Sequence, residues 1–421
     1  MAQKIVMLGG RRAGKSTILA SIIEQLSSET HSDICVFEQV IEEDTEALFN
    51  KTRELEGIMS PDQFSLIEPG ETFIRPDNAE FIVDMNPSVG IDEYQLRCNL
   101  SYNQSVTLSF YDAPGEAMAM PNKNEKDPKG ELVFKDPETN ATYNALIDQH
   151  SQLKSLIPNT DVFVIVIDTP FLMEATPAQN KIYNRIEEIN NLLTANIRFD
   201  KALYGLDKKL ILFCPVKCEK WIHENKIDSV VKKIKIAYKS LIDKCAQHPD
   251  IEMYILPIQT AGNLEFSSFK SAMLLKNESQ SLECAYSPKD NMITLRSGEM
   301  MLKEENQKVV PDTRRWYFIN GNKIPSSWYR VINQGVFAPK NCEQVAYYIL
   351  RFLVNKEIAI KEAKHKNLTW WEKIKEKILT IWQPSFGELL EDYKLMVQKL
   401  EDRHLIKINT DGICKIEIKK L

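Results

Sequence analysis

The sequence of 421 residues has no long apolar run, and no segment reaches the roughly 18 uncharged apolar residues that a membrane-spanning helix needs. Its first residues also lack the basic start and apolar stretch of a signal peptide. We therefore expect a cytoplasmic protein that does not cross a membrane.

An excess of positive charge is absent as well, because the formal net charge is -6. Such a chain has no whole-molecule attraction for nucleic acid or for an anionic membrane surface. The eight cysteines show no paired CxxC spacing, and the six histidines do not cluster with them. We expect reduced thiols, no zinc site, and neither nucleic acid nor membrane as a partner.

Hydrophobic residues make up 43% of the chain, which is ample for a packed core. Apolar strand candidates alternate with helical patterns such as Ala141–Leu156 and Ile227–Lys244, and this alternation predicts an α/β fold with a mostly parallel sheet flanked by helices. The expected strands are Lys4–Leu8, Tyr94–Leu100, Val106–Tyr111, Val162–Ile167, Leu210–Phe213 and Met253–Ile258.

We predict one main domain over residues 1–355, with large insertions at about 28–92, 116–138 and 266–340. The third insertion breaks the alternation, since Met292–Lys303 and Val309–Lys323 are predicted as strands and Asn320-Gly321 as a turn. Asn341–Asn355 then restores an amphipathic helix, which we expect to be the last helix of the core.

Residues 356–421 are predicted to form a small C-terminal segment of helices and a β-hairpin. Trp370, Trp371 and Trp382 stand among lysines, a pattern that suits docking on the protein's own core or a partner better than a membrane interface. Ser385–Arg403 is an expected helix, and a hairpin is expected to turn at Asp411-Gly412 between strands Leu405–Ile408 and Cys414–Ile418. This segment is most simply a protein-interaction tail.

The strongest motif follows the first strand. GGRRAGKS satisfies G-x-x-x-x-G-K-[ST], the phosphate loop, in which backbone N–H groups and the start of the next helix surround phosphate oxygens. Lys15 is expected to neutralise the β and γ phosphates, and Ser16 to place its hydroxyl on Mg²⁺. The expected nucleotide contacts here are Gly9, Gly10, Arg11, Arg12, Ala13, Gly14, Lys15, Ser16 and Thr17.

A second motif, Asp112-Ala113-Pro114-Gly115, follows the strand Val106–Tyr111. A carboxylate at this position is expected to organise magnesium, and Gly115 to turn its N–H toward a γ-phosphate. Asp168, at the end of another apolar run, competes on hydropathy, but the Asp-x-Pro-Gly signature favours Asp112 and leaves Asp168 as a strand-end residue.

Taken in order, GGRRAGKS and DAPG resemble the first and third motifs of the TRAFAC-class P-loop GTPases. The resemblance implies GTP and Mg²⁺ as ligands. Val216-Lys217-Cys218-Glu219 is similar to the base-reading motif, so Glu219 would accept hydrogen bonds from two guanine N–H donors and Lys217 would lie along the base plane. Val216 departs from the asparagine or threonine of that motif. Thr260 and Ala261 match the fifth motif.

The insertions and the Ala-Pro-Gly-Glu form are similar to bacterial double-GTPase proteins of biological-conflict and phage-defence systems. That resemblance implies a GTP-hydrolysing switch that works with protein partners. Two alternatives remain open: an ATP-dependent P-loop NTPase, and a nucleotide-binding scaffold with little hydrolysis.

Catalytic groups are sparse around these motifs. Glu116 stands where many family members carry a glutamine or histidine that orients water, and as an ionised carboxylate it would be repelled by the γ-phosphate. Arg11 and Arg12 are candidates for transition-state stabilisation and equally for a surface patch. Thr45, Thr52 and Thr72 all qualify as the switch threonine for magnesium. We therefore expect slow hydrolysis by the isolated chain.

Overall fold

The computed structural model describes residues 3–10, 13–28, 35–39, 80–81, 83–84, 90–100, 104–122, 141–197, 208–277, 283–287, 292–293, 295–296, 302–305, 308–311, 316–332, 337–367, 386–402 and 413–416.

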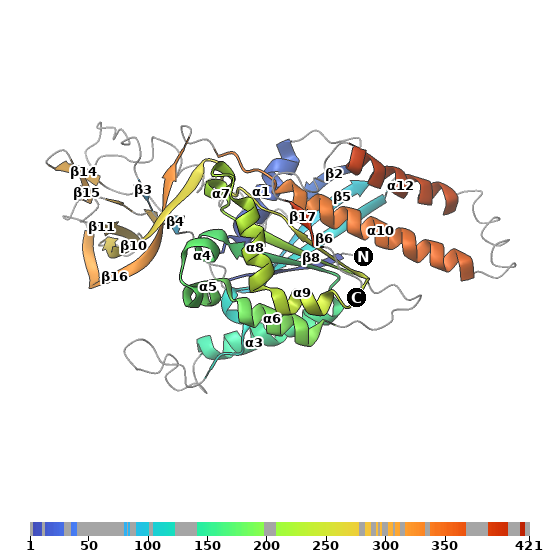
Figure 1. Ribbon diagram of the computed structural model, residues 1–421, viewed down its shortest axis with the longest axis horizontal. Helices are drawn as coiled ribbons and strands as arrows, with labels where there is room; N and C mark the ends of the chain where they lie inside the picture. The colour runs from blue at the N-terminus through green and yellow to red at the C-terminus, as the bar shows by residue number, and fades with distance from the viewer. Residues whose placement is uncertain are drawn as a thin grey trace.

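An eight-stranded sheet forms the centre of the molecule, in the order β17-β9-β8-β7-β1-β6-β5-β2 (Figure 1). The five strands from β6 to β9 in that order run parallel, while β5, β2 and β17 pair antiparallel at the two sides. The predicted α/β class with a mostly parallel sheet is therefore confirmed. Its strands are β1 (Gln3–Leu8), β2 (Cys35–Gln39), β5 (Asp92–Leu100), β6 (Gln104–Asp112), β7 (Val162–Asp168), β8 (Lys209–Val216), β9 (Ile251–Ile255) and β17 (Cys414–Lys415).

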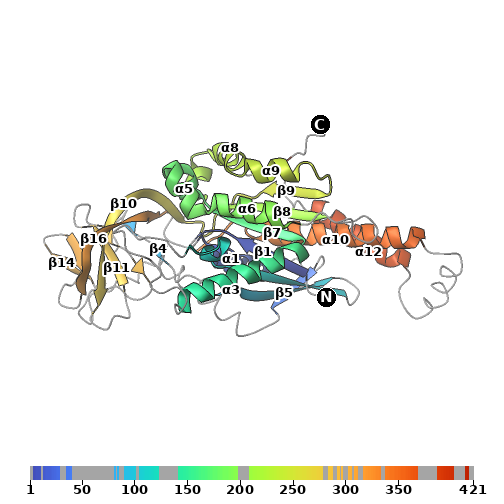
Figure 2. The ribbon, with the colours of Figure 1, turned by 90° about the horizontal axis from the view of Figure 1, so that it is seen from below.

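The central strands are buried on both faces, because helices cover each side of the sheet (Figures 1 and 2). Val6 and Leu8 of β1 pack into one core, and Ile5 and Met7 into the other, as the two-residue period of a strand requires. All seven residues of β7 and all eight of β8 are buried. Continuous apolar runs of this kind are typical of parallel strands.

One helical layer consists of α1 (Lys15–Ser28), α10 (Glu343–Asn367) and α12 (Phe386–Asp402), which contribute to the same hydrophobic core. The opposite layer contains α3 (Ala141–Leu156), α4 (Thr169–Glu174), α5 (Pro177–Asn184), α6 (Ile186–Asn196), α7 (Glu219–His223), α8 (Ile227–Ala237) and α9 (Lys239–Cys245), together with the 3-10 turns Gly115–Met118 and Ile157–Asn159.

A second sheet projects from one end of the core, and we call its two long strands and their partners the arm (Figure 1). Strands β10 (Leu264–Asn277) and β16 (Trp316–Val331) pair antiparallel along most of their length. The shorter strands are β3 (Glu80–Phe81), β4 (Val83–Asp84), β11 (Glu283–Ser287), β12 (Met292–Ile293) and β13 (Leu295–Arg296), with β14 (Leu302–Glu305) and β15 (Lys308–Pro311) as a separate pair. Most strands of the arm lie in the expected insertion at 266–340, whereas β3 and β4 lie in the one at 28–92.

Two local predictions were wrong. Asn320-Gly321 is not a turn but part of β16, where the register with β10 shifts, because pairing along the rest of the long strand overrides a two-residue turn signal. The expected helix Ile227–Lys244 is divided at Tyr238 into α8 and α9.

The end of the chain also contributes to the core. Helix α10 continues through residue 355 to Asn367, and β17 pairs with the edge strand β9. Helix α12 matches the expected Ser385–Arg403, whereas Trp370, Trp371, Trp382 and the turn at Asp411-Gly412 lie outside the described residues.

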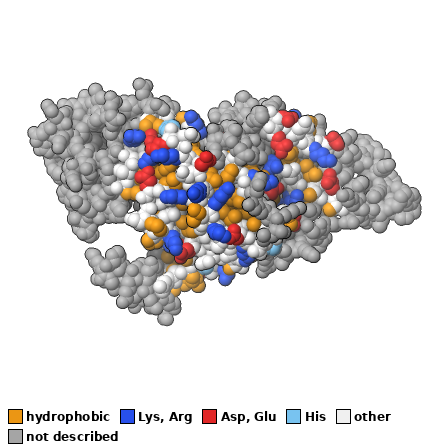
Figure 3. Space-filling model, in the orientation of Figure 1, with side chains coloured by type: hydrophobic (Ala, Val, Ile, Leu, Met, Phe, Trp, Pro, Cys, Tyr) orange, Lys and Arg blue, Asp and Glu red, His pale blue; other side chains and the backbone are white. Residues whose placement is uncertain are grey.

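Within the described part of the chain, no helix combines the length and apolar character needed to cross a membrane. Basic and acidic side chains are interspersed on the face shown in Figure 3. Exposed ion pairs such as Lys239 with Asp243 and Lys181 with Glu187 illustrate this mixing.

Candidate functional site: a phosphate loop and its flanking strand ends

The phosphate loop connects β1 to α1, at the carboxyl edge of the central sheet. Glycine is required at position 10, since a Cβ there would lie 1.7 Å from the carbonyl oxygen of Tyr183, at the end of α5. The loop therefore packs directly on the backbone of α5. Arg11 and Arg12, which the sequence offers as catalytic groups, lie outside the described residues.

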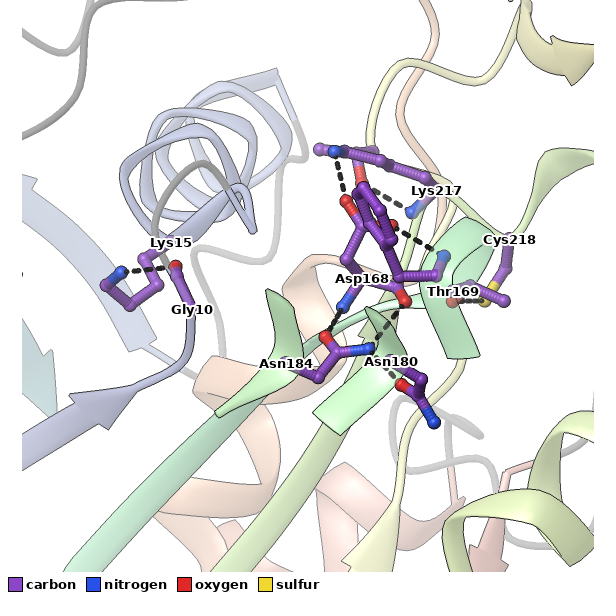
Figure 4. Close-up of polar contacts among 10 residues, drawn as sticks. Gly10, Lys15, Asp168, Thr169, Asn180, Asn184, Lys217 and Cys218 are labelled. Atoms are coloured by element: carbon purple, nitrogen blue, oxygen red, sulfur yellow. Dashed lines mark hydrogen bonds and ion pairs between the residues drawn. The ribbon is translucent and has the colours of Figure 1, made fainter. Parts of the chain in front are cut away.

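Lys15 and Ser16 begin α1 and are both buried, with exposed fractions of 6% and 7%. Lys15 Nζ donates to the carbonyl oxygens of Gly10 (3.1 Å) and Gly9 (3.3 Å), so the ammonium group lies within the loop (Figure 4). The same nitrogen is 3.9 Å from Asp112 Oδ1. The ammonium group of Lys15 therefore lies where the motif predicts the phosphates of a nucleotide.

Asp112 ends β6, the strand beside β1, and its side chain is fully buried. Ser16 Oγ donates a hydrogen bond to Asp112 Oδ2 at 2.6 Å. A hydroxyl and a carboxylate oxygen are hard ligands of the kind that Mg²⁺ takes, and they meet beside the loop lysine. The donor set therefore fits the predicted magnesium site of Ser16 and Asp112.

Gly115 is buried and begins the 3-10 turn that follows the DAPG motif, while Glu116 is half-buried in the same turn. The turn packs near α3, where His150 Nδ1 lies 2.9 Å from the carbonyl oxygen of Ala117. Thr45, Thr52 and Thr72 lie outside the described residues, so the choice of switch threonine stays open.

Asp168, the competing carboxylate, ends β7 and has a different set of partners. Its Oδ1 accepts from the N–H of Phe171 (3.2 Å) and caps α4, and its Oδ2 accepts from Lys217 Nζ at 2.5 Å (Figure 4). Asp112 is the carboxylate bonded to Ser16, whereas Asp168 is a buried strand-end residue that forms an ion pair with the partly exposed Lys217.

Lys217 follows β8 and adopts the left-handed conformation, with φ at 59°. Its N–H donates to Thr260 Oγ1 (3.0 Å), which joins the expected fourth and fifth motifs. Burial acts to lower the pKa of Lys217, but Asp168 and Tyr329 raise it above the ordinary value. The ammonium group is therefore firmly charged and is held by Asp168.

Glu219 is 1% exposed at the start of α7. Its Oε1 accepts from the N–H groups of Ala261 (2.9 Å) and Gly262 (3.1 Å). Burial raises the pKa of this carboxyl to about 7, although those backbone hydrogen bonds lower it. This carboxylate therefore joins the start of α7 to the loop that precedes β10.

The strand ends therefore bring together Lys15, Ser16 and Asp112 on one side, and Lys217, Glu219, Thr260 and Ala261 on the other. Helix α1 connects the two groups, because Ser21 Oγ donates to the carbonyl oxygen of Thr260 (3.1 Å). The residues of both groups lie along one edge of the sheet. Their contacts with a nucleotide stay predictions.

Asn184, which no sequence motif identifies, lies beside Asp168 at the end of β7. Its Oδ1 accepts from the N–H of Asp168 (2.7 Å), and its Nδ2 donates to the carbonyl oxygen of Asp168 (3.1 Å) and to Asn180 Oδ1 (2.8 Å) (Figure 4). One fully buried amide thus fixes the end of β7 to α5, the helix on which the phosphate loop packs.

No family model matches the sequence, and no curated protein matches it either. Among solved structures, the chain is similar to the GTPase-like domain of Ski7 from S. cerevisiae, in a form bound to GTP and in one bound to GDP and inorganic phosphate. Identity is 10% in both cases, with 79% of this chain and 71% of that chain covered, and the TM-scores are 0.28 and 0.26. Because both TM-scores lie below 0.5, the fold assignment rests on the sheet order and phosphate loop of this chain.

Proposed function

We propose that this protein binds GTP with Mg²⁺ and hydrolyses it slowly as a molecular switch. The observation that carries the proposal is the contact between Ser16 of the phosphate loop and Asp112 at the end of the neighbouring strand, 2.6 Å apart and beside Lys15. Phosphate-binding loops of this form combine backbone N–H groups, a lysine and a magnesium-binding hydroxyl.

Each residue then has a definite task. Lys15 and the N–H groups at the start of α1 would hold the β and γ phosphates, and Ser16 and Asp112 would hold magnesium, which neutralises phosphate charge when bound. Thr260, Ala261, Lys217 and Glu219 lie along the same edge and would form the base side. The order of these motifs supports guanine as the base. Val216 stands where the motif has asparagine or threonine, so ATP binding is tested beside GTP binding.

The test is titration of purified protein with fluorescent GTP and ATP analogues in the presence of Mg²⁺. Lys15→Ala is expected to weaken binding by at least a hundredfold, because it removes the buried cation that would face the phosphates. Lys4→Ala is the matched control, since Lys4 is an exposed lysine of the strand that leads into the loop. Equal affinities of wild type and Lys15→Ala would overturn the proposal, and tighter ATP than GTP binding would favour the ATPase.

Slow turnover is expected because Glu116 is a poor group for positioning water. Activator-free GTPases turn over at about 10⁻⁴ to 10⁻² s⁻¹, and we expect the lower part of that range. Release of phosphate under multiple turnover measures the rate. A rate on the order of 1 s⁻¹ would show that the chain completes its own site, and Arg11→Ala and Arg12→Ala would then identify the contributor.

We further propose protein partners for this switch, on the resemblance to double-GTPase proteins and on the presence of the arm. A role in phage defence predicts that cells carrying the gene and its genomic neighbours resist phage, and that Lys15→Ala abolishes the resistance. Full resistance with Lys15→Ala would exclude a nucleotide-dependent defence role.

A further inference from the structure

Tyr329 comes from β16 of the arm, yet its ring lies against the core at the base side of the site. The side chain is 3% exposed, and Lys217 Nζ lies 6.0 Å from the centroid of the ring. A lysine at this distance from an aromatic face is attracted by the ring's quadrupole. The arm therefore contributes one of the groups that surround Lys217.

Lys217 is constrained from several directions. Its backbone holds a left-handed conformation that lysine rarely adopts, with the N–H fixed by Thr260, and its ammonium group is bound by Asp168. Strained, over-determined residues of this kind concentrate at functional sites. A quarter of the lysine side chain is exposed, so part of it is available to a ligand.

A second contact joins the arm to α7, the helix that follows Lys217. Phe266 of β10 pairs with Tyr329 across the two long strands, and the rings meet edge to face at 5.8 Å. Phe266 also stacks on Trp221 of α7, with ring centroids 6.0 Å apart and an interplanar angle of 15°. Helix α7 begins two residues after Lys217. The root of the arm, where Tyr329 and Phe266 lie, therefore contacts both Lys217 and Trp221 of this helix.

We propose that the arm completes the nucleobase side of the nucleotide site, with Tyr329 as the positioning residue that holds Lys217 for stacking along the base. Binding of the base and docking of the arm are then thermodynamically linked, and each strengthens the other by the same factor. This inference rests on the proposed nucleotide binding and adds a route by which bound nucleotide changes the stability of arm docking.

The first test compares GTP with inorganic tripolyphosphate, which engages the phosphate loop but has no base. Tyr329→Leu is expected to weaken GTP binding about tenfold and to leave tripolyphosphate binding unchanged, whereas Tyr329→Phe keeps the ring and the affinity. Tyr238→Leu is the matched control, because Tyr238 is also a fully buried tyrosine but packs on Phe213, with ring centroids 5.3 Å apart. It should lower stability without changing the ratio of the two affinities.

The reciprocal test measures hydrogen exchange at the root of the arm in the wild type. The N–H of Ile332 donates to the carbonyl oxygen of Asn263 (2.9 Å), which extends the β10–β16 ladder, and so reports on the pairing of the strands that carry Phe266 and Tyr329. GTP is expected to slow its exchange several-fold and tripolyphosphate to leave it unchanged. This measurement needs no variant, so it decides the matter even if Tyr329→Leu does not fold.

Equal GTP affinity of Tyr329→Leu and wild type, or equal effects of GTP and tripolyphosphate on Ile332, would overturn the coupling while nucleotide binding stands. Failure of the wild type to bind GTP, ATP and tripolyphosphate would overturn the proposed function, and this inference with it.

Discussion

The buried carboxyl of Glu219 gives a quantitative prediction about stability. Its pKa rises from an ordinary 4.5 to about 7, mainly because burial disfavours the charged form. Between pH 4.5 and about pH 7, Glu219 keeps its proton in the folded protein but has released it in the unfolded chain. The contribution of Glu219 to stability is therefore complete below pH 4.5 and decreases as the pH rises to about 7, by about 3 kcal/mol in total.

The substitution Glu219→Gln isolates this effect, since the amide oxygen can still accept from Ala261 and Gly262 but carries no charge at any pH. We expect the stability of the variant relative to wild type to increase between pH 5 and pH 8, by about 2 to 3 kcal/mol. Urea unfolding at several pH values, followed by tryptophan fluorescence, measures this difference.

Glu224→Gln is the control. Lys226 lowers the pKa of Glu224 below its ordinary 4.5, so the contribution of that carboxylate is lost only below that pH, and the stability of this variant relative to wild type should stay constant between pH 5 and pH 8. A difference between Glu219→Gln and wild type that stays constant from pH 5 to pH 8 would refute the reasoning, because a carboxylate that ionises normally would produce that result.

Three further substitutions test the packing around the site. Gly262→Ala should destabilise the fold by about 3 kcal/mol in chemical denaturation, because φ is 79° and the new Cβ would lie 1.8 Å from the carbonyl oxygen of Ala338; a neutral effect would contradict this geometry. Asn184→Ala should cost about 1 to 3 kcal/mol, since buried peptide groups at the end of β7 lose their partner, and an unchanged midpoint would show that water replaces the amide. Gln25→Ala should cost about 1 kcal/mol and speed amide exchange at the start of α10, and unaltered exchange there would argue against capping by Gln25.

Much of the core could be predicted from local sequence patterns. Helix α3 matches the expected Ala141–Leu156, and the strands β7 and β8 coincide with uninterrupted apolar runs. The phosphate loop could be predicted equally well, because its strand, loop and helix are adjacent in the chain. These elements depend on neighbours in sequence, which a single sequence contains.

The residues that the sequence did not reveal act across long separations. Tyr329 reaches Lys217 from the arm, and Asn184 bonds to Asp168 from the end of another helix. No spacing rule connects such positions, since their contact depends on how the chain returns to the sheet. The contact of Glu219 with the loop amides was missed for a related reason, because the length of a side chain matters only once the distance to its target is known.

The contacts of Gln25 have a consequence for the order in which the chain folds. From α1, its Oε1 accepts from the N–H groups of Cys342 and Glu343, and its Nε2 donates to the carbonyl oxygen of Pro339. The partner Glu343 lies 318 residues later in the chain. At a synthesis rate of about 5 to 20 residues per second, roughly 16 to 64 seconds separate the two on the ribosome. During that interval the apolar face of α1 cannot be covered by α10, so this half of the core closes only after residues 339–367 have been synthesised.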